Sequence, residues 1–180
     1  MRLFLVRHLA PLVPSGVCYG RTDLATDPAA QALALPALRA ALPAQAPVYT
    51  SPLRRCAELA GALGGAVLVD MRLAELDFGS WEMQRWDDID RAAIDAWAAD
   101  VAGYRPGGGE SVAGMAARIA AFYADLRDTN VADAVVICHA GAIRLLVARA
   151  AGLGVDGMAL AAAARPHAIG YGEIVILDCV

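Results

Sequence analysis

Short, continuous apolar runs alternate along this chain with longer segments that carry helix-capping residues. Apolar runs of this kind are typical of strands that are buried on both faces of a sheet. They predict strands at residues 2–6, 46–52, 66–70, 133–138 and 172–179. The segments between them predict helices at residues 28–42, 53–64, 84–100, 112–128 and 141–151. Strands that alternate with helices indicate a layered α/β domain with a largely parallel central sheet.

Turn and cap residues place the boundaries of these elements. Asp27 and Pro28 offer a helix N-cap followed by a proline at the first helical position. Residues 11–28 are rich in proline and glycine and predict a long loop, and a long loop after a first strand often carries function. The length of 180 residues fits a single domain spanning 1–180, with no internal repeat and no low-complexity linker.

Composition narrows the classes of function. The net charge is −4, and all 15 basic residues are arginines that are mixed with acidic ones. This balance argues against a protein that binds nucleic acid or a membrane surface. No apolar run approaches the roughly 20 residues that span a bilayer, and the first residues do not resemble a signal peptide. We expect a cytoplasmic protein whose four scattered cysteines are reduced thiols, and the sequence carries no signal for an oligomeric state.

Two of the three histidines directly follow predicted strands. His8 comes after the first strand with Arg7 before it, and His139 follows the fourth strand. Ligands of α/β sheets bind beyond the carboxyl ends of the strands, so we expect both histidines to share one site with segment 51–55. A cation beside an imidazole lowers its pKa, so Arg7 is expected to keep His8 neutral and nucleophilic. The third histidine, His167, is expected to be structural or exposed.

The arginines suggest what this site binds. Arg54 and Arg55 lie in the first turn of a predicted helix, where the helix dipole disfavours cations. Such a placement favours an anion that is held between a guanidinium and the helix N-terminus. Two histidines also suit a metal ion, but no third ligand has fitting spacing, and nearby arginines would repel a cation. The pattern predicts a phosphate site without metal or cofactor. Arg144, in a later helix, either steers anions or faces solvent.

Four segments appear in order along the chain: LVRH (5–8), TSPLRRCAELA (50–60), LAELDFGSWEM (73–83) and HAG (139–141). Together they resemble the signature segments of the histidine phosphatase superfamily, also called the phosphoglycerate mutase-like family. The resemblance extends from Arg2 to about Leu146. It implies a three-layer αβα sandwich with a mostly parallel central sheet, and hydrolysis of phosphomonoesters without a metal ion.

The resemblance also assigns roles to single residues. It implies that His8 is the nucleophile that becomes a phosphohistidine. Arg7, Arg55 and His139 match the family's phosphate-binding residues. Glu75 matches the proton donor, which would protonate the leaving oxygen and then activate water.

Some positions near these residues leave alternatives open. Glu82, in SWEM, competes with Glu75 for the role of proton donor, although the family's L-x-E-x-x-x-G segment favours Glu75. The chain departs from the family at Leu9, where many members have glycine, and at Met83, where the segment W-E-G is frequent. Neither position is one to which the resemblance assigns a chemical role, but Leu9 is expected to narrow the space near the nucleophile.

The loop GVCYGRTDLA (16–25) bears on the substrate. It resembles the corresponding loop of alpha-ribazole phosphatases, which act in cobalamin nucleotide-loop assembly. This implies a small phosphorylated substrate such as alpha-ribazole 5′-phosphate. The residues that the resemblance places on the substrate side are Tyr19, Gly20, Arg21 and Ala140.

Residues 76–110 are expected to form a partial lid, which favours a small substrate. Three tryptophans are expected to pack this lid: Trp81, Trp86 and Trp97. Two alternatives to a small-molecule phosphatase stay open. One is a general or phosphoprotein phosphatase, and the other is a catalytically silent protein that binds phosphorylated ligands. The presence of both His8 and Glu75 argues against the silent protein.

Overall fold

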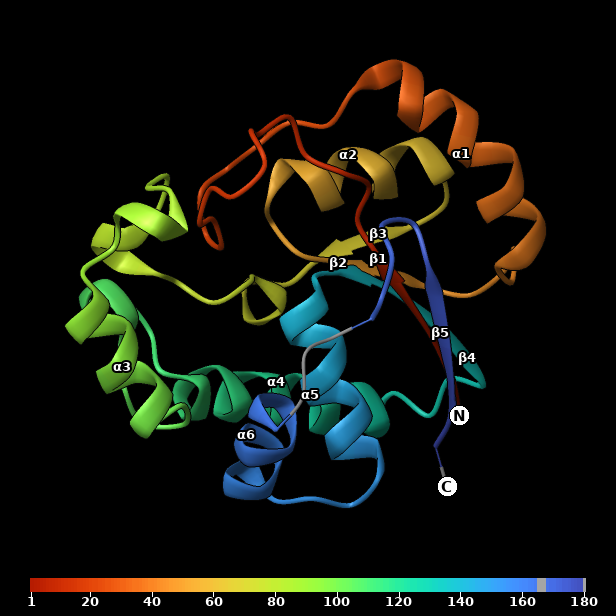
Figure 1. Cartoon of the computed structure of the whole chain (residues 1–180). Coiled ribbons are helices and arrows are strands. Elements are labelled where there is room, and N and C mark those ends of the chain that lie inside the picture. Colours follow the sequence, from red (N-terminus) through yellow and green to blue (C-terminus); the bar gives the residue numbers. More distant parts are fainter. Residues whose placement is uncertain (165–167, 180) are drawn as a thin grey trace.

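The described residues of the computed structural model form a central sheet of five strands in the order β3-β2-β4-β1-β5 (Figure 1). The structure describes residues 1–164 and 168–179, so His167 lies outside the described residues. The strands are β1 (Arg2–Arg7), β2 (Val48–Thr50), β3 (Val67–Val69), β4 (Asp133–Cys138) and β5 (Ile174–Asp178). The first four run parallel to one another, and β5 pairs antiparallel with β1.

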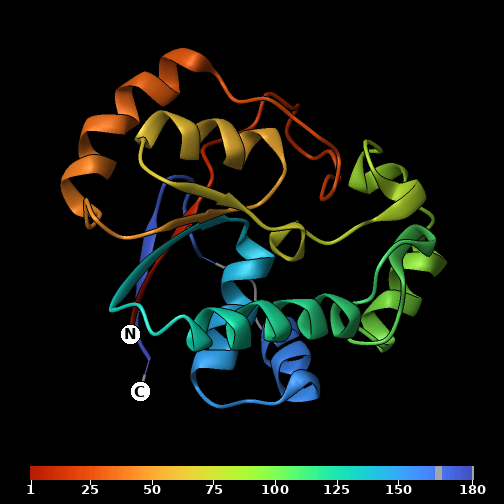
Figure 2. The same cartoon turned by 180° about the vertical axis from the view of Figure 1, so that it is seen from behind.

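Helices cover both faces of this sheet, as the two opposite views show (Figures 1 and 2). One face carries α1 (Pro28–Ala41) and α2 (Arg54–Leu63). The other face carries α4 (Val112–Asp128), α5 (Ala140–Ala150) and α6 (Val155–Ala163). The three-layer αβα sandwich with a mostly parallel sheet is therefore confirmed.

The alternation of side chains along β1 explains why its apolar run is continuous. Leu3 and Leu5 are buried in the core beneath α4, α5 and α6. Phe4 and Val6 are buried in the second core, beneath α1 and α2. Because successive side chains of a strand point to opposite faces, a strand between two helical layers needs an apolar residue at every position.

Two elements differ from the sequence prediction. The helix predicted for 84–100 begins only at Arg91, because the side chain of Asp90 accepts a hydrogen bond from the backbone of Ala92 and caps the helix there (α3, Arg91–Ala99). Helix α6 was not predicted, since its alanine-rich sequence has little amphipathic pattern and no side-chain cap. Packing stabilises it instead, with Met158 and Ala159 buried against α4 and α5.

Residues 76–110 form a lobe beside the sandwich, built from α3 and short 3₁₀ turns (Figure 1). The lobe has its own small core around Trp81 and Ile89. At its base the backbones of Gly79 and Gly107 lie so close that a Cβ atom on either would overlap the other segment's backbone. The position of the lobe at one end of the sheet fits the predicted lid, whose closing role stays a prediction.

In the part of the chain that the structure describes, no helix has both the length and the apolar character needed to cross a membrane.

Candidate active site

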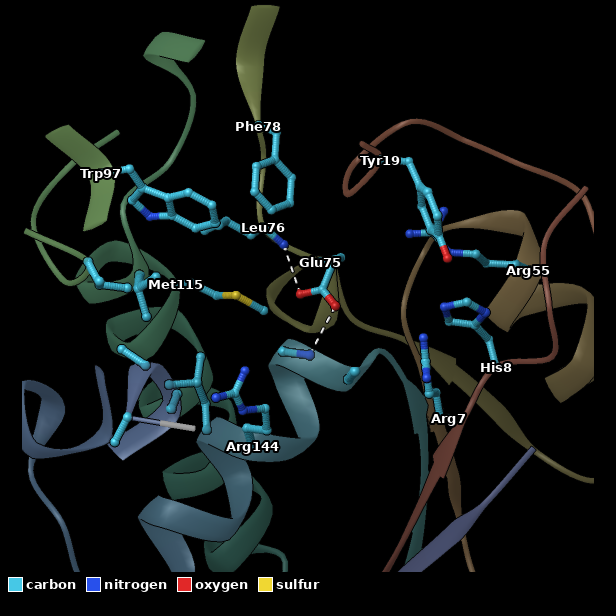
Figure 3. A pocket seen from close by; sticks show the side chains of 18 residues that line it. Arg7, His8, Tyr19, Arg55, Glu75, Leu76, Phe78, Trp97, Met115 and Arg144 are labelled. Atoms are coloured by element: carbon cyan, nitrogen blue, oxygen red, sulfur yellow. Dashed lines mark hydrogen bonds between the residues drawn. The ribbon is translucent and has the colours of Figure 1, made fainter. Parts of the chain in front are cut away.

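The carboxyl ends of β1 and β4 converge on one pocket of about 510 Å³ (Figure 3). His8 follows β1 and His139 follows β4, and their ring centroids lie 5.0 Å apart. Arg55 comes from the first turn of α2 and also lines this pocket. The structure thus brings together the two histidines and Arg55 from distant parts of the chain, because adjacent parallel strands end at the same edge of the sheet.

His8 is a buried, neutral imidazole with a fixed orientation. Its Nδ1 lies 2.6 Å from the carbonyl oxygen of Leu9. A carbonyl only accepts hydrogen bonds, so Nδ1 carries the proton and Nε2 keeps its lone pair. Burial lowers the pKa of His8 to about 3, with smaller contributions from the charges of Arg55 and Arg7. The sequence analysis attributed the neutral state to Arg7, whereas desolvation is the main cause.

The depressed pKa of His8 predicts a loss of stability in acid. Because the folded protein holds this imidazole neutral, only the unfolded chain takes up its proton between pH 6.5 and about pH 3. The free energy of unfolding should therefore fall as the pH is lowered through this range, by about 2 kcal/mol at pH 5 from His8 alone. Urea unfolding at pH 7 and pH 5 measures this loss. In His8→Asn the loss should be smaller by that amount, and an equal loss in both proteins would contradict the prediction.

Arg55 is a fully buried cation without a carboxylate partner. Its guanidinium donates hydrogen bonds to the backbone carbonyls of Thr22 and Gly20. Among the described residues, its Nε has no hydrogen-bond partner and no Asp or Glu lies within ion-pair distance. The neighbouring Arg54 is exposed and pairs with Glu58 at 2.9 Å. A buried positive charge without a counter-charge favours the binding of an anion.

Arg7 supplies a second, half-buried cation on the opposite side of His8 (Figure 3). It donates a hydrogen bond of 2.6 Å to the carbonyl of Ile169, and its guanidinium carbon lies 3.8 Å from the ring centroid of Tyr171. Its Nε also lacks a partner within the described residues. Two guanidinium groups therefore flank a neutral imidazole, which is an arrangement suited to a phosphate group.

His139 lies behind His8 and not on the wall of the pocket. It has 0% of its surface exposed, and its Nε2 lies 2.7 Å from the Oγ of Ser51. Burial and then the charge of Arg55 hold the pKa of His139 well below its ordinary value. In this structure His139 packs against the ring of His8, and its expected contact with phosphate stays a prediction.

Glu75 is the carboxylate that faces the pocket. Its Oε1 accepts a hydrogen bond from the backbone of Leu76, and its Oε2 accepts one from Gly141 at the start of α5, each at 3.0 Å. A Cβ atom at position 141 would overlap this carboxylate, so a larger residue there would displace the Glu75 side chain. Each oxygen keeps a second lone pair for a proton or a substrate atom.

Glu82 holds a loop together and does not line the pocket. Its carboxylate accepts backbone hydrogen bonds from Gly20, Arg21, Thr22 and Phe78, and a further one from the Thr22 hydroxyl. Burial on its own would raise the pKa of Glu82, but these hydrogen bonds outweigh it and lower the pKa below the ordinary value. The structure therefore separates the two candidate acids, with Glu75 in the pocket and Glu82 between the loop and the lobe.

This difference predicts distinct effects for Glu82→Gln. The variant should lose about 2 kcal/mol of unfolding free energy, because it removes a charged acceptor of several hydrogen bonds. The loosened loop carries Tyr19 and contacts Arg55, so KM should rise more than kcat falls. Urea unfolding and steady-state kinetics measure both. Glu58→Gln, on the exposed surface, is the matched control and should change little, and a large selective loss of kcat in Glu82→Gln would contradict the assignment.

Two of the predicted substrate residues do not line the pocket. Gly20 is buried where the loop approaches the carbonyl of Leu76, and a Cβ atom there would overlap that oxygen. Arg21 is exposed, and its guanidinium Nη1 lies 3.7 Å from Oδ2 of Asp77. Both positions lie in the loop that Glu82 holds, and their expected contact with substrate stays a prediction. Tyr19 and Ala140 do line the pocket.

Tyr171 is a site residue that the sequence analysis missed. Its hydroxyl lies 2.7 Å from that of Tyr19, and its ring centroid lies 5.6 Å from that of His8. The two tyrosines come from loops far apart in the sequence and meet beside Arg7 and His8. No motif surrounds Tyr171. Only its position just before β5, the strand that pairs with β1, could have indicated that it lies near His8.

Within the described ranges, no three His, Cys, Asp or Glu side chains come together as a metal site would require. The four cysteines are free and buried.

Comparisons with known proteins agree with this geometry. The sequence profile of the histidine phosphatase superfamily (branch 1) matches residues 3–170. The structure of TTHB049 from Thermus thermophilus is 30% identical, with 99% of this chain and 94% of that chain covered and a TM-score of 0.75. Mycobacterial glucosyl-3-phosphoglycerate phosphatase is 28% identical over 97% of this chain and 88% of that chain, with a TM-score of 0.80. The alpha-ribazole phosphatase from Shigella flexneri is similar in fold. It is 24% identical, with 99% of this chain and 90% of that chain covered and a TM-score of 0.82.

Proposed function

Because this chain belongs to the histidine phosphatase superfamily (branch 1) and is a phosphatase, we propose that it hydrolyses a small phosphomonoester through a phosphohistidine on His8. The family and the enzyme class agree with the prediction from the four sequence segments. The observation that carries the proposal is the pair of guanidinium groups, of Arg7 and Arg55, that flank a neutral His8 and have no carboxylate partner among the described residues.

In the first step, the phosphate dianion binds between the two arginines, which neutralise its charge. The Nε2 lone pair of His8 attacks phosphorus, while Leu9 holds the Nδ1 proton and fixes the ring. The bond from phosphorus to the ester oxygen breaks, and Glu75 in its acid form gives that oxygen a proton. An alcohol leaves, and a phosphohistidine remains.

In the second step, Glu75 is a carboxylate and takes a proton from a water molecule. That water attacks phosphorus, the bond from phosphorus to Nε2 breaks, and inorganic phosphate leaves. His8 is again neutral and Glu75 is again an acid, so the cycle closes. The backbone hydrogen bonds from Leu76 and Gly141 keep the carboxyl group in place for both steps. The arginines supply the positive charge that a metal ion supplies in other phosphatases, so we propose a metal-independent reaction.

The proposed substrate is alpha-ribazole 5′-phosphate or a related small metabolite. The loop sequence at 16–25 supports it, and so does a pocket of about 510 Å³, a volume suited to a small molecule. The experiment measures phosphate release from alpha-ribazole 5′-phosphate and a panel of phosphomonoesters with EDTA present. A strong preference for alpha-ribazole 5′-phosphate would support the proposal in full. Broad release without preference would retain the reaction and reject this substrate.

The burial of His8, of which 3% is exposed, disfavours the phosphoprotein alternative, because a folded protein surface would have to reach past Tyr19 and the lobe. The panel therefore includes a phosphohistidine protein and a phosphoserine peptide. Release from these alone would replace the small-molecule proposal. No release from any substrate would favour a silent phospho-ligand-binding protein.

A further inference from the structure

The pocket has two chemically different halves (Figure 3). Arg7, His8 and Arg55 surround the phosphate end. Beyond Glu75 the walls are almost entirely apolar. This far half is formed by Leu76, Phe78, Trp97, Val112, Met115 and Leu145, together with alanines at the end of α6.

We propose that the far half is a binding site for a bulky apolar group, such as an aromatic ring system, on the alcohol portion of the phosphomonoester. This inference rests on the proposed reaction and specifies its substrate class. If the phosphate lies between Arg7 and Arg55, the ester oxygen must lie at Glu75 to be protonated. The part of the pocket that lies beyond Glu75 is the apolar half, so an alcohol group that stays in contact with the pocket extends into it.

The aromatic wall is held in place by the lobe and does not depend on a ligand. The indole of Trp97 stacks on that of Trp86 with centroids 6.1 Å apart and an interplanar angle of 9°. Trp97 also packs edge to face with Phe78 and with Trp81, at 5.9 and 5.8 Å. A preformed wall loses little entropy when a ligand binds, so contact with it contributes directly to affinity.

The far half offers few polar groups to a substrate. Arg144, one turn into α5, is the only cation among the described residues that line this half, and Glu75 is the only carboxylate in the described lining. A polyol or an ammonium group would find few partners in this half of the described pocket. Burying such groups unpaired is unfavourable. A neutral apolar group matches the walls.

Ethyl phosphate and 2-(1-naphthyl)ethyl phosphate test the proposal, because their leaving groups have similar acidity and differ mainly in the apolar group. O-Phosphoserine adds a small substrate whose alcohol portion is charged. We expect kcat/KM for 2-(1-naphthyl)ethyl phosphate to exceed that for ethyl phosphate and O-phosphoserine by about 10- to 100-fold. Equal values for the three substrates would overturn the apolar site and leave the proposed reaction intact. No hydrolysis of any of them would count against the reaction itself.

Two variants on one helix localise the effect. Ala163 lines the pocket in the last turn of α6, so Ala163→Phe should fill the far half. It should lower kcat/KM for the naphthyl substrate at least about 10-fold more than for ethyl phosphate. Ala161 is exposed on the same helix and does not line the pocket, so Ala161→Phe controls for the cost of the larger side chain. A preference that is unchanged in Ala163→Phe would reject the proposed location.

Discussion

We expect His8→Asn to lower kcat by about 10⁴-fold or more, because it removes the proposed nucleophile that lies between the two arginines. Asparagine suits this test because its amide N–H is able to donate to the carbonyl of Leu9, as Nδ1 of the imidazole does. The variant keeps both arginines, so it should still bind inorganic phosphate. Phosphate release and calorimetric phosphate binding measure the two properties.

The same reaction leaves a direct chemical trace. Wild-type protein quenched in alkali during turnover of a labelled phosphomonoester should carry a protein-bound phosphate that is stable in base and labile in acid, as a phosphohistidine is. His8→Asn should carry none. Substantial turnover by His8→Asn, or a label that survives acid and is lost in base, would contradict the assignment of His8.

Glu75→Gln is expected to lower kcat for alkyl phosphates by about 10²- to 10⁴-fold, because the amide can neither protonate the leaving oxygen nor accept a proton from water. The side chain has nearly the same shape, so loss of packing contributes little. Only one of the backbone donors, Leu76 or Gly141, can keep an oxygen acceptor. The loss should therefore include a modest decrease in stability.

The choice of substrate separates the two proton transfers. With 4-nitrophenyl phosphate the leaving group needs no acid, so His8 should still be phosphorylated in Glu75→Gln. Water activation remains defective, so we expect a burst of about one nitrophenolate per protein followed by slow turnover. Stopped-flow absorbance measures the burst. Glu82→Gln is the control and should show none, whereas a burst in Glu82→Gln and none in Glu75→Gln would exchange the roles of the two residues.

Much of the fold follows from local patterns. The apolar run of β1 predicts a strand between two helical layers, because both its faces are buried by separate cores. The first residues of α1 and α4 follow from Asp27 and Ser111, whose side chains cap the N-termini of these helices. Helix α6 has no such signal, because its alanines gain their stability from packing against α4 and α5 and not from any pattern of their own.

The sequence by itself determined that His8, His139 and Arg55 lie close together, since the two histidines follow adjacent parallel strands and Arg55 lies in the first turn of α2. Tertiary structure alone decided how each one acts. It buries His8 and thereby lowers its pKa, and it closes His139 off behind it. It brings Tyr171 from a distant loop into contact with Arg7 and His8. These properties depend on burial and on contacts between residues far apart in the chain, which no local pattern of residues encodes.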